Sequence, residues 1–107
     1  MRFYGLKSCD TCRKAQKALV AAGHPVEIVD VRSDGVTRAD LQRFHAAFGD
    51  ALLNTRSTTW RGLSEVERAR DPIELLLDHP TLMKRPVIDA ETLYLGWGKD
   101  VQAKLIG

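Results

Sequence analysis

The spacing of apolar residues divides the first third of the chain into a strand, a helix and a strand. Residues 2–5 form an apolar run ending at a glycine turn, which predicts a short strand. Residues 10–22 carry apolar side chains at helical spacing, and Gly23 follows where a helix end favours positive φ. Residues 25–31 alternate and are rich in β-branched side chains, which predicts a second strand. Such a unit is typical of two parallel strands with a right-handed crossover.

Capping patterns predict helices in the middle of the chain. Thr37 followed by Asp40 resembles a capping box ahead of an apolar stripe that ends at Gly49. Ser64 begins a second capping pattern, and Asp71 before a proline begins a third. Between them, residues 52–62 lack a clean period and are rich in polar side chains, which predicts a loop. A polar loop of this length inside a compact domain is more often functional than idle.

The last part of the chain returns to strands. Residues 86–89 and 92–95 predict a β-hairpin, and residues 99–106 predict a closing helix. The order is therefore β-α-β-α, a helical stretch, and β-β-α. We expect one α/β domain over residues 1–107 with a helical insertion at about 37–80.

Composition and charge narrow the possible functions. The chain has 107 residues, 44% hydrophobic and 28% charged, a balance typical of one globular domain. The net charge of +2 gives no basis for direct nucleic-acid binding. No apolar run approaches the ~20 residues of a membrane span, and the first residues lack the layout of a signal peptide. We therefore expect a cytoplasmic protein that does not bind membranes.

Two cysteines stand where the first strand meets the first helix. Cys9 and Cys12 form a Cys-x-x-Cys motif, and close cysteine pairs in the cytoplasm indicate redox or metal chemistry rather than a structural disulfide. Cys9 is nearest the helix N-terminus, whose N–H groups and dipole stabilise a thiolate. Cys12, one turn further, could resolve a mixed disulfide on Cys9. Lys7 adds positive charge nearby, whereas Asp10 opposes it.

Other interpretations of the cysteines are weaker but remain open. Zinc needs about four ligands, and the three histidines are scattered without paired spacing, so no metal is expected. Inert cysteines remain possible. Redox chemistry at a strand-to-helix turn, in the thioredoxin-like manner, is the interpretation that the motif favours.

Three arginines are candidates for binding an anion. Arg85 precedes Pro86 at the start of the third strand, and its guanidinium suits oxyanions. The alternative is a solvated Arg85 beside an ordinary trans proline, and the sequence leaves both open. Arg56 and Arg61, in the polar segment, could complete an anion pocket, although such loops often carry arginine for solubility alone.

Three segments together resemble the arsenate reductase (ArsC)-related family of thioredoxin-like proteins. They are YGLKSCDT at residues 4–11, ALLNTRSTTWR at 51–61 and KRPV at 84–87. The resemblance spans the chain and is nearest to the short bacterial YffB-like branch, a neighbour of the Spx and MgsR regulators. It implies a glutaredoxin-like fold with a four-stranded mixed sheet and a helical insertion before the third strand. It also implies a nucleophile at Cys9 and an arginine at Arg85 that precedes a cis-proline. That proline, Pro86, is expected to face the cysteine and to expose backbone that binds a substrate peptide or thiol.

The same resemblance implies a function and its alternatives. A YffB-like protein is expected to be a glutathione-dependent thiol reductase, with glutathione as co-substrate, no bound cofactor and glutaredoxin as a possible partner. A true arsenate reductase is one alternative, although the arginine set of those enzymes is incomplete here, because Arg56 is offset and residues 96–98 replace a C-terminal arginine. Many members of the branch lack a cysteine at the Cys12 position. A pair like this one is usual in Spx-type regulators, whose partner is RNA polymerase.

Overall fold

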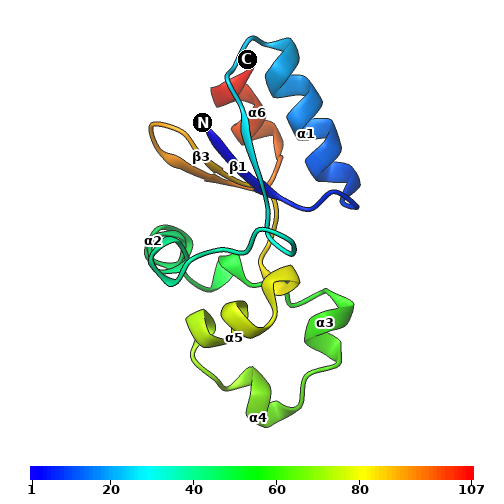
Figure 1. The fold of residues 1–107 in the computed structure, drawn as a ribbon, viewed down its shortest axis with the longest axis vertical. Coiled ribbons are helices and arrows are strands. Elements are labelled where there is room, and N and C mark those ends of the chain that lie inside the picture. Colours follow the sequence, from blue (N-terminus) through cyan, green and yellow to red (C-terminus); the bar gives the residue numbers. More distant parts are fainter. The chain divides into compact units, whose positions relative to one another are not determined.

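The structure is a computed structural model that describes residues 1–107. The chain forms two compact units, which we name the sheet unit (residues 1–34 and 85–107) and the helical unit (residues 35–84). Figure 1 shows the elements of each unit along the chain. The expected organisation as one domain with an insertion remains a prediction. No helix combines the length and the apolar character needed to cross a membrane.

The sheet unit is built on four strands. It contains β1 (Arg2–Gly5), α1 (Asp10–Ala21), β2 (Glu27–Asp30), β3 (Val87–Asp89), β4 (Leu93–Leu95) and α6 (Lys99–Leu105). The strand order is β2-β1-β3-β4, with β1 parallel to β2 and antiparallel to β3, and β3 antiparallel to β4. This confirms the predicted mixed sheet, its parallel first pair and its hairpin.

One face of the sheet carries the core of this unit. Phe3 pairs with Ile88 in the sheet register, so both side chains point to the same face. They pack against the buried stripe of α1, which consists of Cys12, Ala15 and Leu19. Helix α6 adds the half-buried side chains of Val101 and Leu105 to the same cluster. The predicted helical periodicity of residues 10–22 therefore reflects this core.

The helical unit consists of short helices. It contains α2 (Arg38–Phe48), the 3₁₀ turn η1 (Gly49–Leu52), α3 (Thr58–Arg61), α4 (Glu65–Arg68), α5 (Pro72–Asp78) and the 3₁₀ turn η2 (Pro80–Leu82). Helix α2 packs against α5, and the fully buried Phe44 ring belongs to the core of this unit. The segments 52–54 and 82–84 lie side by side through backbone hydrogen bonds.

Polar side chains define where these helices begin. The hydroxyls of Thr37 and Ser64 accept hydrogen bonds from backbone N–H groups three residues on, at 3.1 and 3.2 Å. The Asp71 carboxylate accepts from Ile73 N–H at 3.1 Å. All three predicted N-caps are confirmed. Because each cap needs only a few consecutive residues, local sequence was sufficient to predict them.

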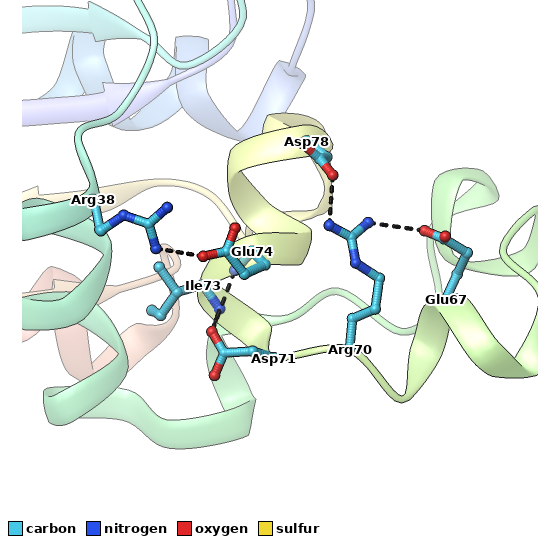
Figure 2. Close-up of polar contacts among 7 residues, drawn as sticks. All are labelled: Arg38, Glu67, Arg70, Asp71, Ile73, Glu74 and Asp78. Carbon is cyan, nitrogen blue, oxygen red and sulfur yellow. Dashed lines mark hydrogen bonds and ion pairs between the residues drawn. The ribbon is translucent and has the colours of Figure 1, made fainter.

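Exposed ion pairs connect the helices of this unit (Figure 2). Arg70 contacts Glu67 at 3.0 Å and Asp78 at 2.6 Å, so it joins the end of α4 to the end of α5. Arg38 contacts Glu74 at 2.5 Å and joins α2 to α5. The pKa of Asp78 is lowered, first because it accepts a hydrogen bond from Arg70 and then because of that cation's charge.

Two sequence predictions need correction. Residues 52–62 are not one loop, because η1 ends at Leu52 and Ser57 caps the helix α3 by accepting from Trp60 N–H at 3.1 Å. A helix of one turn is too short to show an apolar period. The second strand covers only Glu27–Asp30 rather than 25–31, because its partner β1 offers four residues for pairing.

Candidate functional site

Cys9 stands at the N-cap of α1, as the sequence predicts. Its backbone is extended (φ −87°, ψ 116°), its carbonyl accepts from Arg13 N–H at 3.0 Å, and its N–H donates to the Leu6 carbonyl at 3.0 Å. The Cys9 side chain is half-buried, whereas Cys12 is 3% exposed within the core. Both thiols are free. The more accessible sulfur is therefore the one at the positive end of the helix dipole.

The pKa values of the two thiols differ because their surroundings differ. Partial burial raises the pKa of Cys9, but the Cys12 N–H, the Cys12 side chain and the Arg85 guanidinium together bring it below its ordinary value. Burial is the main cause that raises the pKa of Cys12 to about 11, and the neighbouring Cys9 adds to it. One cysteine is thus suited to be a thiolate nucleophile, while the other holds its proton.

Arg85 and Pro86 lie at this site. The Arg85–Pro86 peptide bond is cis, as the resemblance implied. Pro86 is buried and leads into β3, while Arg85 is half-buried and interacts with both sulfurs. The structure thus brings together Cys9, Cys12 and Arg85 from distant parts of the sequence. A guanidinium beside a thiolate can also receive an anionic substrate group.

Gly5 ends β1 ahead of the turn, as predicted, and packing requires a glycine there. Gly5 is the last residue of β1 and is not among the glycines with positive φ. A Cβ atom at this position would lie 2.9 Å from Phe3 Cε1 and 3.1 Å from Cys12 Sγ. Glycine therefore allows the Cys12 sulfur to approach the strand closely.

Lys7 contributes its backbone as well as its charge. Its side chain is exposed, and its N–H donates to the Asp30 carboxylate at 3.3 Å. Asp30 was missed at the sequence level. An aspartate that ends a β-branched strand before a polar turn is the available signal, because such side chains accept N–H groups of their own turn.

Arg56 and Arg61 belong to the helical unit, and both are exposed. Arg56 lines a pocket of about 480 Å³ in that unit together with Asn54 and Lys84. Arg61 ends α3, and its carbonyl accepts from Arg68 at 3.4 Å. Their predicted part in anion binding stays a prediction.

The structure gathers no group of three or more histidine, cysteine, aspartate or glutamate side chains that could hold a metal ion. His24 bonds the Leu105 carbonyl, and His45 faces Asp50.

Comparison with known proteins agrees with this arrangement. An uncharacterised protein of Haemophilus influenzae is 45% identical over 92 residues, 79% of each chain. The regulatory protein MgsR of Bacillus subtilis is 30% identical over 114 residues, covering 98% of this chain and 89% of MgsR. Among solved structures, a YffB protein superposes with a TM-score of 0.89 at 32% identity, covering 99% of this chain and 98% of its own. These likenesses confirm the thioredoxin-like fold.

The sequence pattern of the ArsC family matches residues 4–104, which include both cysteines, the cis-proline, the end of β1 and the other three strands. The chain is therefore a member of the ArsC family.

Proposed function

We propose that the protein is a thiol–disulfide oxidoreductase with Cys9 as its nucleophile. The observation that carries the proposal is the position of Cys9, half-buried at the start of α1, with its pKa lowered by the Cys12 N–H and Arg85. A thiolate at neutral pH is the form that attacks a disulfide. The anion-attracting arginine beside it favours substrates with carboxylate groups, such as glutathione conjugates.

The proposed reaction has two steps. The Cys9 thiolate attacks one sulfur of a substrate disulfide, a mixed disulfide forms, and the other half leaves as a thiolate that takes up a proton. Cys12 or a glutathione thiolate then attacks the Cys9 sulfur and releases the second half of the substrate. Glutathione reduces the resulting disulfide, so that overall one disulfide and two glutathione molecules give two thiols and oxidised glutathione.

Glutathione as reductant fits a cytoplasmic setting, where it keeps thiols reduced. Glutaredoxin is a possible second partner. Burial raises the pKa of Cys12, so Cys12 must lose a proton as it attacks the mixed disulfide. The mixed disulfide is resolved by Cys12 or by glutathione.

A coupled assay tests this proposal. Reduced protein is mixed with glutathione, glutathione reductase and NADPH, and either hydroxyethyl disulfide or arsenate is added as substrate. We expect NADPH consumption with the disulfide that disappears in Cys9→Ser. Turnover with arsenate alone would make the protein a true arsenate reductase. Absence of turnover with both substrates would count against the reductase.

The similarity to MgsR supports a second candidate, a redox-sensing transcriptional regulator that binds RNA polymerase. The Cys9–Cys12 pair would then act as a switch instead of a catalytic couple. Polymerase pull-down with oxidised protein, compared with reduced protein and with Cys12→Ser, separates the two candidates. Capture that depends on the disulfide, without turnover, would favour the regulator.

A further inference from the structure

Asp30, the last residue of β2, is the one charged residue in the buried set, with 6% of its surface exposed. Its carboxylate accepts three backbone hydrogen bonds. Lys7 N–H donates to Oδ2 at 3.3 Å, and Arg32 and Ser33 donate to Oδ1 at 2.9 and 3.0 Å. A buried carboxylate is stable only with such partners, so its place beside the cysteine loop needs an explanation.

The hydrogen bond from Lys7 to Asp30 holds the Leu6–Lys7 segment, which contacts both cysteines. The Leu6 carbonyl accepts from Cys9 N–H at 3.0 Å, and the Leu6 backbone N–H bonds the Cys12 sulfur and lowers its pKa against the effect of burial. Asp30, Lys7 and Cys12 also line one cavity of about 30 Å³. The carboxylate therefore anchors the peptide that touches both cysteines.

We infer that Asp30 is a positioning residue for the two cysteines, because it fixes the Leu6–Lys7 backbone from the neighbouring strand. This inference rests on the proposed function, in which Cys9 reacts and Cys12 lies within its reach. Only a carboxylate can accept on both oxygens here, since the amide of asparagine would place an NH₂ group against a backbone N–H on one side.

Other charged groups near Asp30 are separate from this role. Asp34 accepts from the Asp30 N–H at 2.8 Å in the turn after β2, and Arg13 of α1 lines the same cavity as Asp30. Arg32 and Lys7 contact the carboxylate through their backbones. These two hydrogen bonds should therefore survive substitution of the Arg32 or Lys7 side chain, whereas substitution of Asp30 disrupts them.

The test compares Asp30→Asn with the matched control Asp34→Asn. Asp34→Asn removes the same charge from the same turn without a contact to the Leu6–Lys7 peptide. The alkylation rate of each cysteine by iodoacetamide is followed against pH, with peptide mapping by mass spectrometry, and folding is verified by circular dichroism. Loosening the Leu6–Lys7 peptide weakens the Leu6 N–H bond to the Cys12 sulfur and displaces the Cys12 groups that lower the Cys9 pKa, so we expect Asp30→Asn to move both midpoints upward. Loss of the carboxylate charge alone would move them downward, and Asp34→Asn should not move them upward.

Each outcome of this experiment supports or overturns a specific claim. If Asp30→Asn reproduces an activated wild-type profile, or if Asp34→Asn shifts it equally, the inference is wrong. If wild-type Cys9 itself titrates as a free thiol, the proposed function is wrong instead. Should Asp30→Asn not fold, Asp30→Glu replaces it, because it keeps the charge and displaces the acceptor oxygens by one methylene group. Cysteine profiles in Asp30→Glu that coincide with wild type overturn the inference.

Discussion

The sheet unit and the helical unit are stabilised by different kinds of contact. In the sheet unit, backbone groups hold the important side chains, since N–H groups of Leu6, Lys7 and Cys12 bond sulfur or carboxylate. In the helical unit, side chains cap helix ends, and exposed ion pairs such as Arg70–Asp78 join the helices (Figure 2). A backbone donor persists through every substitution of its own residue except proline, so side-chain substitutions in the two units should have different effects.

The largest expected effect is at Cys9. Cys9→Ser should abolish both turnover and the fast-reacting thiol, because the remaining Cys12 is buried and its pKa is about 11. Cys12→Ser is the matched control and should keep a reactive thiol. If rapid alkylation at neutral pH persists in Cys9→Ser, Cys9 is not the nucleophile.

In the helical unit, the largest effect should be on stability. Phe44→Ala should lower the free energy of unfolding by about 3–5 kcal/mol, because the ring is fully buried and its removal leaves a cavity. Urea denaturation measures this loss. Phe48→Ala, at a half-buried position of the same helix, should cost less, and equal losses would contradict the assigned core.

Removal of Arg85 should change reactivity by an intermediate amount. The guanidinium lowers the Cys9 pKa by its charge and a hydrogen bond, so Arg85→Ala should move the alkylation midpoint upward. Arg85→Lys keeps the charge without the planar fork and should fall between wild type and Arg85→Ala. If wild type, Arg85→Ala and Arg85→Lys give the same alkylation profile against pH, Arg85 does not act on Cys9.

The smallest expected effect is at the ion pair of Asp78. Its folded-state pKa is lowered, so the pair stabilises the protein above the ordinary carboxyl pKa and loses this effect as the pH falls through the folded value. Asp78→Asn should therefore be slightly less stable at pH 7, and the difference should fade below about pH 4. Thermal unfolding at about 1 M salt, where screening is strong, should also remove the difference. A difference that persisted in acid would indicate another role for Asp78.

Features of the fold that depend on neighbouring residues were predicted correctly from the sequence. The caps at Thr37, Ser64 and Asp71 and the stripe of α1 were correct, because each depends on a few consecutive positions. The one-turn helix α3 was missed, since four residues cannot display a period. The length of β2 was wrong because it depends on the partner strand.

The sequence predicted the main residues of the site better than the contacts that hold them together. The Cys-x-x-Cys motif and the resemblance identified Cys9, Cys12 and Arg85, and the structure brings these three together. The demand for glycine at residue 5 and the buried carboxylate of Asp30 arise from contacts between strands and helix, which no local pattern contains. Arg56 and Arg61 were chosen for residue type alone, and they lie in the other unit.

The most direct test of the account is the pH dependence of alkylation of the two cysteines in the wild-type protein, resolved by peptide mass spectrometry. The account predicts a midpoint for Cys9 below the ~8.5 of a free thiol and little reaction of Cys12 below pH 10. A Cys9 that titrates as a free thiol, or a Cys12 that reacts first, would contradict it.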